Sequence, residues 1–149
     1  MLNIVLYQPE IPQNTGNIAR TCTAIGAKLH IIRPIPFEIS DKTVRRAGLD
    51  YWQYLDLEIY DSFESFMVKH ADAMLYFCST KSEKLYTDVE YEDNIFLMFG
   101  PETRGLPEEL IFSGKGTAIK IPMVSSIRSL NLSNAVAVIA YEVVRQRKL

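Results

Sequence analysis

Short apolar runs of strand length recur along the chain, at residues 2–7, 29–33, 55–60, 74–78, 95–99 and 118–121. Most of them are continuously hydrophobic, which is typical of strands buried on both faces of a parallel sheet. The run at 55–60 alternates apolar and polar residues, so we expect it to be half exposed. Helical patterns lie between the runs. This alternation predicts an α/β fold with a mostly parallel sheet flanked by helices.

Local signals predict where the helices begin and end. A helix at 14–25 should end at Gly26, because glycine suits the left-handed position after a helix. The tetrapeptide from Asp61 to Glu64 resembles a capping box that opens the next helix. Pro107, followed by two acids, predicts a further helix start. The last helix should run from 132 to 147.

The last predicted helix is apolar almost all round. One stripe consists of Leu132, Val136, Ile139 and Val143, and further apolar residues from 135 to 141 cover much of the rest. A helix at the end of a small domain normally keeps a polar face. It could be buried deep in its own core, or its second face could pack on another subunit. We favour the second interpretation, which predicts a homodimer.

Length and composition suit one soluble domain across residues 1–149. The chain is 48% hydrophobic and 23% charged, and it has no repeat, linker or apolar run near the ~20 residues of a membrane span. Cys22 and Cys78 form neither a CxxC pair nor a Cys/His cluster, which argues against disulfides and zinc. His30 and His70 are more typical of core or solvated histidines than of metal ligands. We therefore expect a cytoplasmic protein that binds no metal and no membrane.

Three loops, at residues 9–21, 99–107 and 121–135, each follow an apolar run and are rich in Gly, Pro, Asn, Ser and Arg. Unpaired amides at helix starts and small polar side chains suit a polar ligand. Gly100 and Gly105 allow close approach of the backbone. We therefore expect the loops to form one composite site.

The net charge of the chain and the motifs that it lacks limit the classes of function that are possible. A net charge of −2 argues against a protein that coats nucleic acid, yet several arginines lie in or near the loops, so the site itself can be basic. GxGxxG, P-loop, HExxH and GxSxG motifs are all absent from the sequence. The residues present in the loops suit an adenosine-type cofactor and a phosphate-bearing substrate.

Three segments, 14–20, 99–107 and 121–135, resemble in order the three motifs of the SPOUT RNA methyltransferases. Nearly the whole chain is similar to the TrmL (YibK) group of this superfamily, including residues 2–7 and 45–51. That group methylates the 2′-hydroxyl of the tRNA wobble nucleotide, a cytidine or a modified uridine. The resemblance implies a C-terminal trefoil knot that binds S-adenosylmethionine, with no metal. It also implies tRNA rather than DNA as partner, and a homodimer with its active site at the interface.

The resemblance implies roles for individual residues. The catalytic centre would contain Arg20, Asn14, Ser129 and Asn131. The cofactor pocket would be formed by Cys78, Gly100, Glu102, Ile121, Met123, Ser129 and Leu130, and contact at Cys78 would use backbone and bulk. Besides Arg20, the candidate phosphate contacts to RNA are Arg45, Arg46 and Arg128.

A ribose 2′-hydroxyl is a weak nucleophile, so it must be aligned with the methyl group and lose its proton. Because the pKa of arginine exceeds roughly 12, we favour Arg20 as a clamp on the neighbouring phosphate that also polarises the hydroxyl. The alternative is that Arg20 itself acts as the general base.

Two other functions stay open. One is a catalytically silent RNA-binding module, which would not need the four intact motif residues Arg20, Glu102, Ser129 and Asn131. The other is a nucleotide-binding protein acting on a small molecule, which would not need arginines in several loops.

Overall fold

The computed structural model describes residues 1–40, 42–47, 52–124, 126 and 129–148. These residues form a parallel sheet with the strand order β3-β2-β1-β5-β4-β6. The strands are β1 (Leu2–Tyr7), β2 (Lys28–Ile32), β3 (Leu57–Tyr60), β4 (Met74–Cys78), β5 (Ile95–Phe99) and β6 (Gly116–Ile119). The predicted α/β fold with a parallel sheet is therefore confirmed, and every strand pair among the described residues is parallel.

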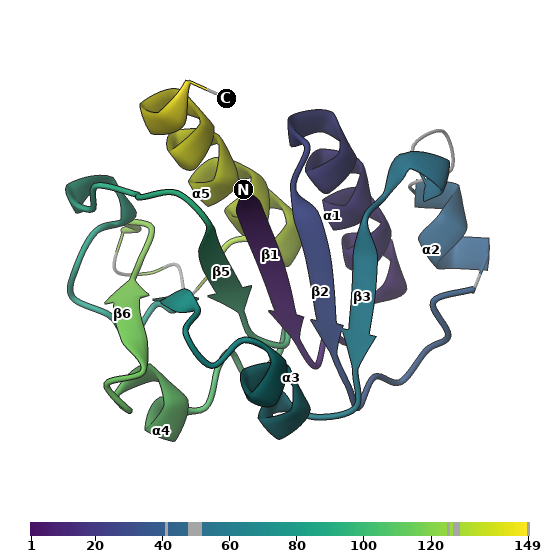
Figure 1. The fold of residues 1–149 in the computed structure, drawn as a ribbon, viewed down its shortest axis with the longest axis horizontal. Coiled ribbons are helices and arrows are strands. Elements are labelled where there is room, and N and C mark those ends of the chain that lie inside the picture. The colour runs from purple at the N-terminus through teal and green to yellow at the C-terminus, as the bar shows by residue number, and fades with distance from the viewer. Residues whose placement is uncertain (41, 48–51, 125, 127–128, 149) are drawn as a thin grey trace.

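Helices cover both faces of the sheet (Figure 1). They are α1 (Pro12–Ile25), α2 (Lys42–Ala47), α3 (Phe63–Lys69), α4 (Glu108–Ile111) and α5 (Leu132–Arg147), with 3₁₀ turns at Trp52–Tyr54 and Tyr86–Asp88. One face carries α1, α2 and α5, and the other carries α3 and α4 (Figure 1). None of the helices in the described part of the chain is long and apolar enough to cross a membrane.

The apolar runs are continuous because each central strand supplies side chains to a core on both faces. Along β1, Leu2, Ile4 and Leu6 belong to the cluster that contains α1 and α5. Val5 points the other way, into the cluster with α3 and α4. This alternation is the period of a strand. The edge strand β3 is only partly buried over its first three residues, as its alternating sequence predicts.

Most predicted boundaries hold to within about two residues, and Gly26 ends α1 in the left-handed conformation as expected. The predicted capping box of Asp61 and Glu64 is wrong. The box lies one residue further on, where the Ser65 amide donates to Ser62 Oγ at 3.0 Å and the Ser62 amide donates to Ser65 Oγ at 3.1 Å. Serine at both ends satisfies the same two amides that serine and glutamate usually do.

The fold brings the polar loops to one edge of the sheet. The carboxyl ends of parallel strands share an edge, and ligands bind there in open α/β sheets. The loop after β1 leads into α1, the segment after β6 leads into α5, and the loop after β5 lies between them. Helices α1 and α5 contact one another, so their amino-terminal ends meet at this edge.

Candidate active site

A cavity of about 850 Å³ opens at the carboxyl edge of the sheet. We call it the main cavity. Its walls come from the start of α1, the residues after β4, the loop after β5 and the segment that leads into α5. All seven predicted cofactor contacts line it: Cys78, Gly100, Glu102, Ile121, Met123, Ser129 and Leu130. The three loops thus form one composite site, as the sequence predicts.

Gly100 shapes the main cavity. A Cβ atom added at this position would lie 2.2 Å from the backbone nitrogen of Leu106, because the loop folds back tightly over it. Gly105 reverses the loop with φ +69°, in the left-handed region that favours glycine. Any side chain at position 100 would therefore clash with the backbone of this loop, so the loop can fold this way only over a glycine. Apolar side chains, including Ile119, Leu132 and Ile139, line the cavity further in.

Glu102 ties the loop after β5 to the start of α1. Its carboxylate accepts hydrogen bonds from the amides of Glu10 (2.8 Å) and Ile11 (2.7 Å). Glu10 returns the contact, because its carboxylate accepts from the amide of Thr103 (2.9 Å) and from the Thr103 hydroxyl. The amide of Thr103 and then its hydroxyl lower the pKa of Glu10 below its ordinary value. We call these contacts the Glu10–Glu102 clasp.

Asn14 links the clasp to the third loop. Its Nδ2 donates to Glu102 at 3.2 Å, and its Oδ1 accepts from Asn131 Nδ2 at 3.1 Å. Asn131 is in turn the N-cap of α5, since its Oδ1 accepts from the amides of Ser133 and Asn134. Only 5% of Asn14 is exposed. A chain of side-chain hydrogen bonds therefore connects all three loops.

The structure brings together three of the four residues predicted for the catalytic centre. Asn14, Ser129 and Asn131 line the main cavity. Arg20 does not line it. On α1, Arg20 lies roughly 9 Å along the axis from Asn14 and about 120° around it, on the exposed face of the helix. A single copy of the chain does not bring Arg20 to the cavity.

Arg46, another predicted RNA contact, does not line the main cavity. Arg46 is an exposed residue of α2. The side chain of Arg45 and the whole of Arg128 lie outside the described residues. No role for any of the three follows from the structure.

Sequence reasoning missed two cations that line the main cavity, Lys81 and Lys120, and gave no role to a third, Arg104 of the second motif. They give its rim the basic character expected from the arginines. All three follow the carboxyl ends of strands: β4, β5 and β6. The rule that ligands bind at this edge could have identified them.

Among the described residues that line the main cavity, none provides a reactive thiol. Burial raises the pKa of Cys78 well above its ordinary value, so its thiol stays neutral. This agrees with contact through bulk rather than through a thiolate. Among the residues described, no group of three or more His, Cys, Asp or Glu side chains is placed to hold a metal ion.

Known proteins are similar to this chain in sequence and in fold. The SpoU rRNA Methylase family model matches residues 1–141, and the chain belongs to this family. A tRNA (cytidine(34)-2′-O)-methyltransferase of Escherichia coli (strain K12) is 48% identical over 147 residues, which cover 98% of this chain and 94% of that protein. The resemblance inferred from the motifs is thereby confirmed.

Two solved structures are similar throughout the chain. One, described as giving structural insights into the 2-OH methylation of C/U34 on tRNA, has a TM-score of 0.94 and 47% identity, covering 99% of this chain and 97% of that one. The other is the SpoU methyltransferase AviRb from Streptomyces viridochromogenes in complex with the cofactor AdoMet. It has a TM-score of 0.88 and 26% identity, covering 99% of this chain and 61% of that one.

Proposed function

We propose that residues 1–149 form one S-adenosylmethionine-dependent domain that methylates the 2′-hydroxyl of the tRNA wobble nucleotide, a cytidine or a modified uridine. The observation that carries the proposal is the convergence of the three motifs on the main cavity. The Escherichia coli relative, 48% identical, is named for this reaction at cytidine 34. A tRNA substrate would place the enzyme in the cytoplasm.

The main cavity suits S-adenosylmethionine. Its volume of about 850 Å³ lies within the range of roughly 300–1,000 Å³ that is typical of cofactor sites. An apolar interior would accept the adenine, while the backbone of the loop after β5 and the polar rim offer hydrogen bonds. The AdoMet complex of AviRb supports this assignment. When bound, the cofactor supplies the methyl group, and the proposed reaction needs no metal.

The residues of the chain would position the nucleotide and handle its proton. Ser129, exposed at the rim of the main cavity, would hydrogen-bond the ribose. Asn14 and Asn131 would hold the wall beside it, because their amides already bond one another. Arg20 would clamp the phosphate next to the target and polarise the 2′-hydroxyl. Arg45, Arg46 and Arg128 stay candidates for further phosphate contacts.

We propose a homodimer in which the partner completes the site. Exposed apolar side chains gather on the last helix and just before it, at Leu130, Val138 and Tyr141. Such a surface is typical of an interface. Arg20 lies outside the main cavity of its own chain, so a second copy packed on this surface would have to bring its own Arg20 there. The over-apolar sequence of α5 would then serve the dimer.

A trefoil knot in the C-terminal half is also part of the proposal. The residues after β6 run beside the connection between β4 and β5: the Lys120 amide donates to the Lys84 carbonyl at 2.9 Å, and the Tyr86 amide donates to the Lys120 carbonyl at 2.8 Å. From there the chain continues into α5, which packs on α1. We propose that this last segment threads through the connection.

The test is direct. Purified tRNA incubated with methyl-labelled cofactor should carry the label on the ribose of the wobble nucleotide. Digestion and mass spectrometry map the position. A label on a base, or on a ribose outside the anticodon loop, would contradict the proposal. RNA binding without methylation would instead favour the catalytically silent module.

A further inference from the structure

A second, smaller hollow of about 320 Å³ adjoins the main cavity. We call it the side hollow. Lys81, Arg104 and part of the loop after β5 line both spaces, so these two cations stand where the spaces meet. The side hollow is also lined by Tyr7, the last residue of β1, and by Gln8, which follows it. The proposed cofactor and target contacts do not use Tyr7, Gln8 or Lys81.

The two cations are available to an anion. Lys81 Nζ lies 2.6 Å from Glu108 Oε1, but half of the Lys81 side chain is exposed. An exposed ion pair of this kind is weak, so a phosphate oxygen can replace the carboxylate. Arg104 Nη2 lies 3.4 Å from Gln8 Oε1. This distance is at the limit of a hydrogen bond, which leaves most donors of the guanidinium for a ligand.

Tyr7 offers a fixed aromatic surface. Its ring contacts Phe63 edge to face, with 6.3 Å between the ring centroids, and Tyr7 is only partly buried. An aromatic ring held in this way is the kind of platform on which unpaired RNA bases stack. Gln8 lies beside it with φ 50°, which is uncommon for a residue other than glycine. Its amide can both donate to and accept from the edge of a base.

We propose that the side hollow binds a nucleotide of the tRNA loop that flanks the methylated one. Its base would stack on Tyr7, and the phosphate that joins the two nucleotides would lie between Lys81 and Arg104. A volume of about 320 Å³ is at the lower end of ligand sites, which run from roughly 300 Å³ upwards. It therefore suits one nucleotide rather than a second cofactor. This assignment rests on the proposed function and makes it more specific.

Abasic substrates test the stacking. Anticodon stem-loop RNAs, each lacking one loop base, are assayed with the wild type, Tyr7→Leu and Tyr7→Phe. For the wild type, removal of one particular flanking base should raise KM about tenfold. Tyr7→Leu should raise KM about tenfold for the intact RNA and be insensitive to loss of that base. Tyr7→Phe should behave as the wild type, because it keeps the ring. The affinity for S-adenosylhomocysteine and the thermal unfolding midpoint, measured on each variant, should not change.

Salt dependence tests the phosphate contact. Lys81→Gln should reduce the slope of log KM against log salt concentration by about 0.7, the value for one phosphate of a single strand. Lys69→Gln is the matched control, because Lys69 also pairs with a glutamate and its side chain is 57% exposed, but it lies away from the side hollow. The control should leave the slope unchanged.

The outcomes separate the two proposals. Suppose that the wild type methylates the stem-loop and that every abasic position has the same effect in the wild type and in Tyr7→Leu. The side hollow is then not a nucleotide site, while the proposed function stands. An unchanged salt slope in Lys81→Gln overturns the phosphate contact. A wild type that methylates no anticodon stem-loop or tRNA overturns both.

Discussion

Asn14 donates a hydrogen bond from its side-chain amide to Glu102 at 3.2 Å, across 88 positions of the chain. Together with the bond from Asn131 to Asn14, this contact fixes the three loops relative to one another. The loops around the main cavity are therefore held in place by the protein itself. Glu102, predicted as a cofactor contact, has its carboxylate occupied by the start of α1. We interpret it as a positioning residue.

Glu102→Gln should lower the free energy of unfolding by about 1–3 kcal/mol. The side chain of glutamine has one oxygen where glutamate has two. Its NH2 group would therefore face the backbone N–H of either Glu10 or Ile11, and that N–H would lose its acceptor. The affinity for S-adenosylhomocysteine should also fall, because the wall of the main cavity loosens. Urea unfolding and calorimetric titration measure the two effects.

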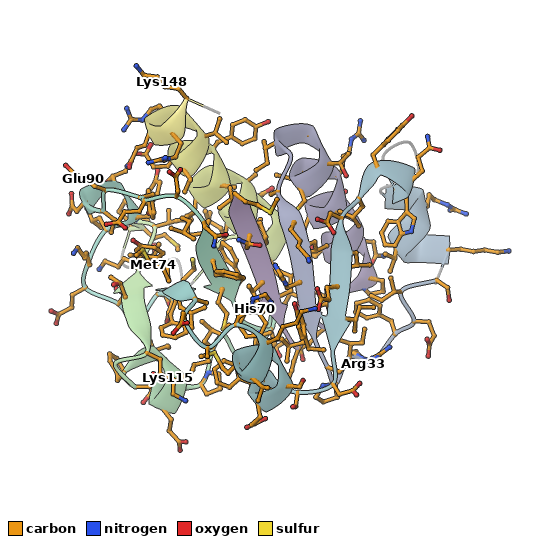
Figure 2. The ribbon with its side chains drawn as sticks, in the orientation of Figure 1. Arg33, His70, Met74, Glu90, Lys115 and Lys148 are labelled. Atoms are coloured by element: carbon orange, nitrogen blue, oxygen red, sulfur yellow. The ribbon has the colours of Figure 1, made fainter. Side chains whose placement is uncertain are left out.

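Glu90→Gln serves as the control for this substitution. Glu90 is exposed at an edge of the molecule (Figure 2) and takes no part in the clasp contacts. The same chemical change there should leave both quantities unaltered. If Glu102→Gln unfolds at the urea concentration of the wild type, the clasp contributes nothing to stability and the interpretation is wrong.

A series of hydrogen-bonded polar side chains, on the face of the sheet that carries α3, makes the free energy of unfolding depend on pH. His30 lies between Asn3 Oδ1 (2.9 Å) and the Tyr60 hydroxyl (2.8 Å), and the Tyr60 oxygen also lies 2.9 Å from His70 Nε2. Because Asn3 Oδ1 can only accept, His30 Nε2 carries its proton, and His30 Nδ1 accepts from Tyr60. His70 then donates to Tyr60 from its place between α3 and the sheet (Figure 2). A second proton on His30, at Nδ1, would force the Tyr60 hydroxyl to turn away and the hydrogen bonds of the chain to rearrange.

Burial, with a smaller effect of His70 and Lys28, lowers the pKa of His30 from its ordinary 6.5 to about 3. The folded protein therefore favours the neutral form of His30. Its contribution to stability is present above about pH 6.5 and is lost as the pH falls towards 3. We expect the free energy of unfolding to decrease by about 2 kcal/mol between pH 7 and 5. Urea unfolding of His30→Gln should show most of this dependence removed. An equal decrease in wild type and variant would show that His30 is not its source.

The proposed dimer predicts that Val138→Asp yields a monomer or an aggregate, because the substitution would bury an unpaired charge in the interface. Val138, on α5, is 38% exposed in the single chain. Val68→Asp, on α3 and 84% exposed, is the matched control and should leave the assembly unchanged. Sedimentation at micromolar concentration distinguishes the two. A monomeric wild type would refute the interface.

The sequence predicted the convergence of the loops because parallel strands share a carboxyl edge, and this depends only on the alternation of strands and helices. The strand order has no such local signal, since it follows from packing among distant elements. The capping box was misplaced by one residue for a related reason: Ser62 and Asp61 are both good caps, and only the backbone geometry decides between them.

Side-chain roles were harder to predict than positions. The resemblance implies a place for Asn131 in the catalytic centre, and the structure adds that this residue caps α5 and bonds Asn14. From the sequence alone, a polar residue at the start of a helix fits a capping role and a catalytic role equally well. Lys81 was missed because its segment carries no motif. Its position relative to the main cavity depends on how β4 is placed in the sheet.

The last prediction concerns Arg20. Arg20→Ala should reduce methyl transfer at least about 100-fold, the usual cost of removing a donor aimed at developing charge. It should largely spare the affinity for S-adenosylmethionine, because the proposed role of Arg20 is toward the nucleotide and not the cofactor. Arg33→Ala, an exposed arginine paired with Asp61, should retain activity. Loss of cofactor binding with turnover intact would reverse the assignment.

A mixed dimer tests whether Arg20 acts across the interface. Cys78→Phe should fill the main cavity with a ring and inactivate its own chain. An Arg20→Ala chain and a Cys78→Phe chain, each with its own tag, are co-expressed. In the mixed dimer the Arg20→Ala chain has the intact cavity, and the Cys78→Phe chain supplies the one remaining Arg20. Activity in the doubly purified dimer is expected if Arg20 serves the partner's cavity. If such dimers form, bind one cofactor and stay inactive, Arg20 acts within its own chain and the proposed shared site is wrong.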